Sequence, residues 1–437
     1  MSLKVLKFGG SSLADAEHFR QVAEIIKSDP ARRYIVASAP GKRNNSDTKI
    51  TDLLYKCYSL AFNEEDITDV FNEVKQRYVD IITNLGMDLD LTEVFEKIRM
   101  SLLHNSGRDY IASRGEYLNA MILAKYLGFS FLDAKKVIFF NEDGSFNAEK
   151  TNDVLREALN NYEYAVIPGF YGSMPNGTIK TFSRGGSDIT GSIVARAASA
   201  TIYENWTDVS GFLMADPRII DNPEPIQTIT YKELRELSYM GATVLHEDAI
   251  FPVRYSKIPI NIRNTNRPED KGTFIVPETD EVGKHVITGI AGRNGFSSIT
   301  IEKAMMNTEL GLGRKVLQVL EENSISFEHF PSGIDTMTVI VSTKALSEKR
   351  GDVLAGICKN VNPENVFVED NMALIAVVGR GMVKVKGTAA RIFTSLAKSN
   401  VNIRMIDQGS SELNIIIGVD ANDYITALNA IYNEFVK

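Results

Sequence analysis

The sequence predicts an α/β protein in which a mainly parallel sheet, layered between helices, is followed by two smaller α+β modules. Three observations support this prediction. Short apolar segments that end in glycine or serine alternate with segments of helical periodicity in the first part of the chain. After about residue 285 the order strand, helix, strand, strand, helix occurs twice. The length of 437 residues allows two or three domains with separate cores.

Strand-like and helix-like segments alternate from the start of the chain. Residues 3–8 form an apolar run before two glycines, residues 15–27 show helical spacing, and residues 34–39 resemble a second buried strand. We expect mostly helix over 64–127. Further strands are expected at 164–168, 178–182, 200–204 and 259–264. Strands joined through helices run parallel and bind ligands outside their carboxyl ends, where the glycine-rich turns of this sequence fall.

The C-terminal part predicts two modules of about 70 residues each, because one pattern of elements is repeated. The first copy covers approximately 299–370 and the second 371–437. Their similarity lies in the pattern more than in the letters. We place the main boundary near Gly292, which gives a first domain of 1–292 and a second region of 293–437.

Composition and charge exclude several classes of protein. The net charge of −8 argues against a general nucleic-acid binder, because such proteins present basic surfaces. The N-terminus lacks a signal-peptide pattern, and no segment approaches ~18 uninterrupted apolar residues. Cys57, Cys358 and the five histidines show no disulfide or metal-ligand spacing. We expect a soluble cytoplasmic protein that binds neither nucleic acid nor membrane and has no side-chain metal site.

The first candidate ligand site is KFGGSS, residues 7–12. Its glycines allow backbone N–H groups to approach an anion, and the helix that follows adds positive potential. Lys7 can reach a phosphate as a mobile point charge. The spacing matches neither the P-loop nor G-x-G-x-x-G. A tight turn without a ligand and a solvated lysine are the alternatives.

The second candidate is SRGGSD, residues 183–188, on a strand-to-helix turn. Arg184 can bind a carboxylate or phosphate through two hydrogen bonds, and the two glycines expose N–H groups. Ser187 can cap the helix, and Asp188 in its first turn can hold a lysine or a magnesium ion beside phosphates. Phosphoryl transfer depends mainly on such positioning and charge neutralisation. The alternative is a plain helix start with an unrelated arginine.

Two further segments are less distinctive. Glu116 lies near the start of an apolar helix, where a glutamate commonly serves as a capping or dipole residue. The segment WTDVSGFLMADPR, residues 206–218, follows a strand and is rich in turn-forming residues. It can surround an adenine, or it can be an ordinary surface loop.

These motifs together resemble one family. KFGGSS, ITDLL, SRGE, SRGGSD, WTDVSGFLMADPR and IRNTNRPEDKGT occur in one order that is similar to the aspartate kinases of the amino acid kinase superfamily. ITGIAGRNGFSSITIEK and VNIRMIDQGSSELNIIIGV resemble the two regulatory ACT modules of that family. The resemblance covers essentially the whole chain. It implies a three-layer amino-acid-kinase-like domain with a mainly parallel sheet, followed by two ACT-like modules.

The resemblance implies a nucleotide side of the site. It assigns Lys7 to the transferring phosphoryl group and Asp188 to the orientation of the phosphate-binding groups. MgATP is the implied phosphoryl donor. The residues implied to lie beside the nucleotide are Gly9, Gly10, Ser11, Thr207, Asp208, Asp216 and Arg218.

The resemblance also implies a substrate side, with L-aspartate converted to 4-phospho-L-aspartate in the first step of lysine, threonine and methionine biosynthesis. It assigns Glu116 to the amino group of aspartate, Arg184 to its α-carboxylate, and Ser187 to a place beside Arg184. Thr51 in ITDLL is implied to help bind aspartate, although an insertion precedes it. The attacking carboxylate is already ionised at pH 7, so no general base is required.

Feedback control by an amino acid is implied at the ACT modules. Met306, Ser326 and Glu328 match positions in the lysine pocket of lysine-sensitive relatives, and an acidic Glu328 favours L-lysine as effector. A solvated strand residue is the alternative for Glu328. Edge strands of such modules commonly pair between subunits, so we expect a homodimer or homotetramer.

One departure from the family leaves a second function open. The family lysine that contacts phosphate is Thr243 here, and the proline that follows the histidine, His246, is Glu247. Lys257 is our expected substitute for that cation. Without one, the protein would be a catalytically silent nucleotide-binding amino-acid sensor. A kinase for another carboxylate or a carbamate is a further alternative, and the length disfavours a fused dehydrogenase.

Overall fold

The computed structural model describes residues 2–104, 106–183, 185–241 and 251–436, and the chain forms two compact units. The first unit comprises Met1–Phe212, Pro225–Tyr231 and Thr243–Thr279. The second comprises Leu213–Glu224, Lys232–Ala242 and Asp280–Lys437. Two segments from the middle of the sequence therefore belong with the C-terminal part. None of the described helices is long and apolar enough to cross a membrane.

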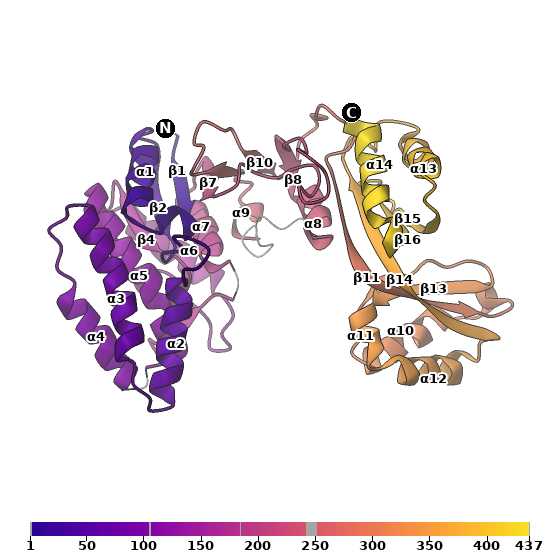
Figure 1. Cartoon of the computed structure of the whole chain (residues 1–437), viewed down its shortest axis with the longest axis horizontal. Coiled ribbons are helices and arrows are strands. Elements are labelled where there is room, and N and C mark those ends of the chain that lie inside the picture. The colour runs from indigo at the N-terminus through magenta and orange to yellow at the C-terminus, as the bar shows by residue number, and fades with distance from the viewer. Residues whose placement is uncertain (1, 105, 184, 242–250, 437) are drawn as a thin grey trace. The chain divides into compact units, whose positions relative to one another are not determined.

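An eight-stranded sheet forms the centre of the first unit (Figure 1). Its order is β3-β4-β2-β1-β7-β9-β10-β8, and every neighbouring pair is parallel except β9 with β10. The mainly parallel sheet expected from the sequence is confirmed. The strands are β1 (Lys4–Phe8), β2 (Arg32–Ala37), β3 (Ser130–Phe131), β4 (Ala165–Pro168), β7 (Ile202–Thr207), β8 (Thr228–Thr230), β9 (Ile260–Asn264) and β10 (Thr273–Val276).

Helices cover both faces of this sheet, because alternate strand residues point to opposite sides. Leu6, Phe8 and Trp206 join the large core formed with the first five helices. Those helices are α1 (Ala16–Lys27), α2 (Ile50–Phe62), α3 (Thr68–Asn84), α4 (Thr92–Leu103) and α5 (Arg108–Leu127). The residues between them in the strands, such as Lys7 and Tyr203, face α7 (Gly186–Ala197), which packs against α6 (Ala148–Leu159) and α9 (Phe251–Tyr255).

Local signals in the sequence define several of these elements. Asp15 caps α1 by accepting hydrogen bonds from the N–H groups of Glu17 and His18. Gly128 ends α5 with a φ of 74°, a conformation that glycine adopts without steric cost. The 3₁₀ turns Ser11–Leu13 and Ala134–Lys136 and the hairpin of β5 (Tyr171–Ser173) with β6 (Ile179–Thr181) complete the elements around the sheet.

The second unit contains a six-stranded antiparallel sheet of order β12-β13-β11-β14-β16-β15. Its strands are β11 (Gly289–Glu302), β12 (Phe327–His329), β13 (Thr336–Ser342), β14 (Asn365–Val378), β15 (Ile403–Asp407) and β16 (Asn414–Asp420). Its helices are α8 (Tyr231–Tyr239), α10 (Leu312–Glu322), α11 (Thr343–Ser347), α12 (Arg350–Val361), α13 (Thr388–Lys398) and α14 (Tyr424–Val436), with 3₁₀ turns at Met306–Thr308 and Ala421–Asp423. Tyr231 itself, at the start of α8, belongs to the first unit.

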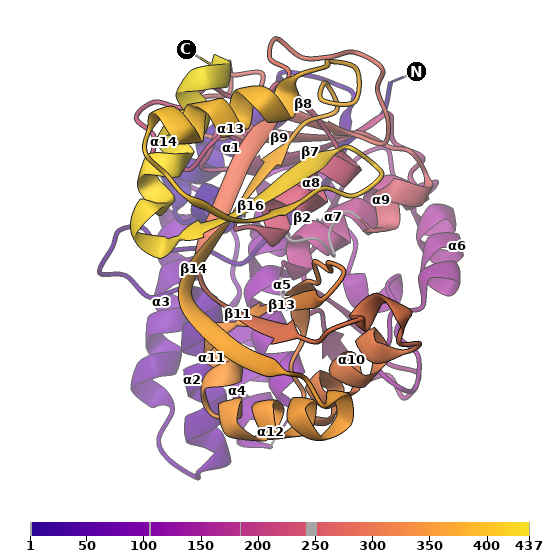
Figure 2. The same ribbon diagram turned by 90° about the vertical axis from the view of Figure 1, so that its right-hand side faces the viewer.

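The two repeats share the long strands β11 and β14, which run through the sheet in Figure 2. Residues 289–294 of β11 pair with 373–378 of β14, and the later part of β11 pairs with the beginning of β14. The boundary expected near Gly292 falls inside β11, where the Gly292 carbonyl accepts a hydrogen bond from Tyr424 Oη at 2.5 Å. In the compact units Thr279 is the last residue of the first unit and Asp280 begins the C-terminal segment of the second, while the domain boundary near Gly292 stays a prediction.

Candidate active site

The strand register brings Lys7 and Asn205 together. Lys7 on β1 is the direct partner of Asn205 on the parallel strand β7, so both side chains emerge on one face of the sheet. Helix α7 covers that face with Asp188 in its first turn. Lys7 Nζ lies 2.5 Å from Asp188 Oδ1 and 3.5 Å from Asn205 Oδ1. Two of the predicted catalytic residues are therefore in direct contact.

Asn205 also holds the aspartate in place. Its Nδ2 donates to Asp188 Oδ1 at 2.8 Å, and the Tyr203 hydroxyl donates to the Asp188 backbone carbonyl at 3.1 Å. Lys7 is 7% exposed and Asn205 3%. Charge–charge interactions are stronger in such a partly dry site than in water. Our reading of the sequence missed Asn205; the signal available was a polar residue inside a buried central strand, because such groups require hydrogen-bond partners.

The glycines after β1 permit close packing of two turns. A Cβ atom on Gly10 would lie 2.8 Å from the Ala39 carbonyl oxygen, and one on Gly41 would lie 2.6 Å from the Gly10 carbonyl carbon. The Gly9 N–H donates to the Trp206 carbonyl at 3.0 Å, so this amide serves the fold. The place of Gly9 beside the nucleotide stays a prediction. Ser11 begins the 3₁₀ turn that follows.

Glu116 is a buried acidic residue that forms no ion pair within 4 Å among the described residues. It lies on α5 with 5% of its surface exposed, and burial raises the pKa of its carboxyl to about 8. In the described part of the chain its Oε2 atom accepts no hydrogen bond. One turn later on α5, Asn119 donates through Nδ2 to the Ser38 carbonyl at 2.7 Å, while its Oδ1 also lacks a donor among the described residues. These two buried acceptors suit a positively charged donor group.

The other predicted substrate residues are partly accounted for. Thr51 is half-buried in the first turn of α2. Ser187 is buried against Gly169, where an added Cβ would lie only 2.6 Å from Ser187 Oγ. Arg184 lies outside the described residues. Thr243, His246 and Glu247 lie outside them as well.

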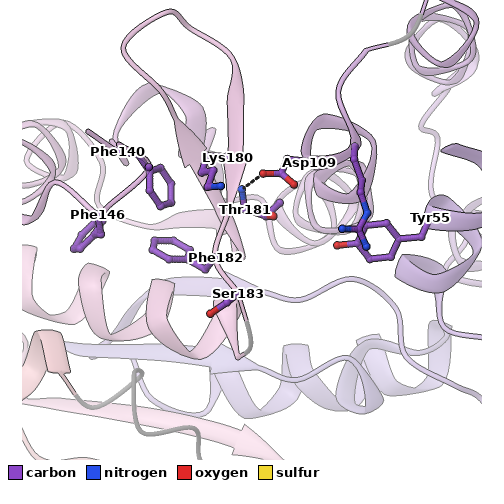
Figure 3. Close-up of a pocket in the computed structure, with 10 residues that line it drawn as sticks. Tyr55, Asp109, Phe140, Phe146, Lys180, Thr181, Phe182 and Ser183 are labelled. Atoms are coloured by element: carbon purple, nitrogen blue, oxygen red, sulfur yellow. Dashed lines mark hydrogen bonds between the residues drawn. The ribbon is translucent and has the colours of Figure 1, made fainter. Parts of the chain in front are cut away.

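A pocket of about 550 Å³ opens beside the segment that leads to Arg184 (Figure 3). Tyr55, Gly144, Thr181 and Ser183 form part of its lining. Three phenylalanines and three charged residues line the rest, namely Phe140, Phe146, Phe182, Arg108, Asp109 and Lys180. The pocket therefore combines an aromatic wall with charged groups, which is typical of sites for small polar ligands.

The expected nucleotide loop is divided between the two units. Thr207 ends β7 in the first unit, where its Oγ1 donates to Asp208 Oδ1 at 3.2 Å. Asp216 and Arg218 belong to the second unit, with Arg218 Nη2 2.6 Å from Asp216 Oδ2. The hydrogen bond from Arg218 lowers the pKa of Asp216. Within the described residues no group of three or more His, Cys, Asp or Glu side chains could hold a metal ion.

The predicted effector residues do not share one environment. Met306 is buried at the 3₁₀ turn after β11, and Ser326 is exposed before β12. Glu328 on β12 accepts a hydrogen bond from the Tyr239 hydroxyl at 2.5 Å and forms an ion pair with Arg293 at 3.3 Å. The carboxylate that we expected to meet a basic amino acid is thus engaged within the second unit.

Lys257, our expected substitute for the family lysine at position 243, is exposed. It follows α9 with a left-handed φ of 54°, and its N–H donates to the Arg254 carbonyl at 3.3 Å. The role of Lys257 as the cation beside the phosphates therefore stays a prediction. The KM for ATP of the Lys257→Ala variant would test it.

Comparisons with known proteins identify the family of this chain. Residues 2–264 match the model of the amino acid kinase family, and residues 375–435 match an ACT domain model. The chain is 39% identical over 456 residues to aspartokinase 3 of Bacillus subtilis, covering 99% of this chain and 98% of that protein. The crystal structure of Clostridium acetobutylicum aspartate kinase superposes with a TM-score of 0.92 at 52% identity, with complete coverage of both chains.

Escherichia coli aspartokinase III shares the fold at 24% identity. Its complex with lysine and aspartate matches with a TM-score of 0.73, covering 100% of both chains. Its complex with aspartate and ADP matches with a TM-score of 0.72, covering 99% of both chains. From the matching kinase model and the two closer relatives, it follows that this chain belongs to the aspartokinase family of phosphotransferases, with an amino acid kinase domain and a C-terminal ACT region.

Proposed function

We propose that this enzyme transfers the γ-phosphoryl group of MgATP to the side-chain carboxylate of L-aspartate, giving 4-phospho-L-aspartate and ADP. The observation that carries the proposal is the contact of Lys7 with Asp188 at the carboxyl end of β1, on the strand next to Asn205. A buried cation beside the end of a parallel sheet suits an incoming phosphate. Bound aspartate and ADP in Escherichia coli aspartokinase III support the same assignment by analogy of fold.

On the phosphate side, Lys7 is the group that neutralises the transferring phosphoryl oxygens. Asp188 holds the ammonium of Lys7 in one place, and Asn205 holds Asp188. An aspartate side-chain oxygen forms the new bond to phosphorus while the bond to the leaving ADP oxygen breaks. The Mg²⁺ that accompanies ATP would neutralise part of the phosphate charge, and Asp188 is the carboxylate that would lie beside it.

On the substrate side, Glu116 is the proposed partner of the α-ammonium group. Its unpartnered Oε2 and the neighbouring Asn119 Oδ1 offer two buried acceptors. Arg184 is proposed to bind the α-carboxylate, with Ser187 and Thr51 close to the same substrate. The β-carboxylate then remains free to attack, because it is ionised at pH 7 without help from a base.

Regulation by L-lysine at the ACT region is the second part of the proposal. The Escherichia coli relative has been solved with lysine and aspartate. Glu328 is the acidic candidate for the effector, and lysine would have to compete there with Arg293 and Tyr239. Such an effector inhibits when it binds the inactive state more tightly. The product would enter lysine, threonine and methionine biosynthesis. The enzyme itself would be a homodimer or homotetramer.

The test is ATP-dependent acyl-phosphate formation from L-aspartate, trapped with hydroxylamine, with and without L-lysine. Turnover suppressed by lysine supports both parts of the proposal. Turnover that lysine does not affect keeps the kinase and rejects lysine as effector. Folded protein that binds ATP but forms no hydroxamate would instead support the alternative of a catalytically silent amino-acid sensor, in which Thr243 replaces the family lysine.

A further inference from the structure

Two cations line the pocket beside β6. Arg108, the first residue of α5, lies over the ring of Tyr55 with its Cζ 4.4 Å from the ring centroid. Lys180 on β6 is half-buried, and in Figure 3 its side chain lies beside Thr181 and Asp109. Across the described ranges neither cation forms an ion pair within 4 Å. Both therefore remain able to attract an anion.

The one acidic group in the lining is already engaged. Asp109 Oδ2 accepts a hydrogen bond from the Thr181 N–H at 3.1 Å, which joins the start of α5 to β6 (Figure 3). Asp109 also lies in the first turn of α5, where the helix dipole favours an anion. Among the described lining residues, Arg108 and Lys180 carry two positive charges against the one negative charge of Asp109, so the lining has an excess of positive charge.

The pocket is lined by residues of elements that also carry proposed substrate residues. Tyr55 lies one turn beyond Thr51 on α2, and Arg108 lies on the helix that carries Glu116. Ser183 directly precedes Arg184 in the chain. Burial raises the pKa of Tyr55, and the charge of Glu116 adds to that increase, so the pocket wall lies within the electrostatic reach of Glu116.

Three packed phenylalanine rings form one side of the pocket. Phe182 packs against Phe140 and Phe146, with ring centroids 4.9 Å and 5.7 Å away. A wall of this kind offers no hydrogen bonds to water and lowers the local dielectric, which strengthens the attraction between a cation and an entering anion.

We propose that Arg108 and Lys180 form a cationic vestibule that captures the dicarboxylate substrate and directs it to the subsite of Glu116. The proposal rests on the proposed function, because it takes L-aspartate as the ligand. L-aspartate carries a net charge of about −1 at pH 7. The whole chain has a net charge of −8, which repels such a substrate unless a local cationic surface offsets the repulsion. Arg108 and Lys180 are thus positioning residues for substrate entry.

The experiment compares Arg108→Gln, Lys180→Gln and the double variant with the wild type. The KM for L-aspartate is measured by hydroxamate formation, and the Kd by calorimetry, at about 0.02 M and about 0.5 M KCl. Lys97→Gln, which removes one exposed charge from α4, is the matched control. We expect KM and Kd to rise about three- to fivefold in each single variant and about tenfold in the double variant at low salt, with kcat unchanged.

At high salt the difference in KM and Kd between the variants and the wild type should disappear, because salt screens the attraction between the two cations and L-aspartate. Arg108→Lys should restore most of the affinity, which a purely structural role of the guanidinium would not predict. Equal Kd values for wild type and double variant at low salt would overturn the vestibule, as would an increase that persists at high salt. Because Kd is measured without turnover, aspartate binding without catalysis would reject the proposed function and leave the vestibule standing.

If Arg108→Gln lowers the midpoint of urea unfolding, its effect on Kd could reflect lost stability. The Kd of Lys180→Gln alone then tests the vestibule. Lys180 stands on the hairpin of β5 with β6, outside α5. A change in kcat rather than in KM for that variant would contradict the role in substrate entry.

Discussion

Lys7 Nζ and Asp188 Oδ1 lie 2.5 Å apart, although one residue stands on the second-to-last position of β1 and the other in the first turn of α7. The contact exists because the register of β1 with β7 directs Lys7 to the face of the sheet that α7 covers. Asp188 thereby determines where the ammonium group sits. The pair is the point of the molecule at which fold and proposed chemistry coincide.

Asp188→Asn should lower kcat by about 10²- to 10³-fold, because Lys7 loses the charge that holds it against the site. The change keeps the shape of the side chain, so the fold should persist. Steady-state hydroxamate formation measures the effect, and Asp69→Asn on the exposed surface of α3 is the control. A kcat within threefold of wild type would remove Asp188 from the proposed mechanism.

Asn205→Ala should lower kcat by about tenfold, less than Asp188→Asn, because Asn205 acts through Asp188. The double variant Asp188→Asn/Asn205→Ala should be no slower than Asp188→Asn alone, since residues of one network are not additive. The same assay on all three variants gives the answer. Independent, multiplying effects would show that Asn205 contacts the substrate or serves another purpose.

Glu116 should make the stability of the first unit depend on pH. Its folded pKa of about 8 lies above its ordinary value of 4.5, so the folded state binds the proton more tightly than the unfolded chain. The contribution of Glu116 to the free energy of unfolding should therefore be fully present below pH 4.5. It should decrease as the pH rises to about 8, by at most about 1.4 kcal/mol per pH unit.

Glu116→Gln should remove that decrease, whereas Glu93→Gln on the surface of α4 should not. The single tryptophan, Trp206, is buried in the first unit, so its fluorescence follows urea unfolding of this unit. Identical pH profiles for wild type and Glu116→Gln would mean that Glu116 has a charged partner in solution.

Gly10→Ala should destabilise the first unit by about 1–3 kcal/mol and lower kcat, because the new methyl group meets the Ala39 carbonyl oxygen at 2.8 Å and shifts the turn beside Lys7. Gly107→Ala is the matched control, since no described atom lies within 4 Å of its added Cβ. Urea unfolding followed by Trp206 fluorescence compares the two. Equal stabilities would indicate that the turn at 39–41 moves aside without cost.

Arg380→Leu should destabilise the second unit by about 3–5 kcal/mol, because it removes the guanidinium that is paired with a buried carboxylate. Glu233 on α8 is fully buried and lies 2.9 Å from Arg380 Nη1. Hydrogen exchange of the β14 and β16 amides measures the loss, while the Trp206 transition of the first unit serves as internal reference. Arg350→Leu breaks an exposed pair with Asp370 and should cost less than about 1 kcal/mol; a similar cost for both variants would contradict the importance of burial.

The sequence by itself determined the order of the elements, the parallel character of the first sheet and the family, because periodicity and glycine-rich turns are local properties. It also singled out Lys7, Asp188 and Glu116 as residues of interest. Asn205, Asn119 and Arg108 escaped notice because each is defined by a partner far away in the chain.

Only the tertiary structure decided which polar residues meet and which stay without a partner. The contact of Lys7 with Asp188 depends on strand register and on the helix that covers one face of the sheet. The sharing of β11 by the two repeats depends on long-range strand pairing, and the boundary predicted near Gly292 falls inside this strand. Desolvation of Glu116 likewise arises from atoms distant in sequence, so burial and its effect on the pKa follow only once the chain is folded.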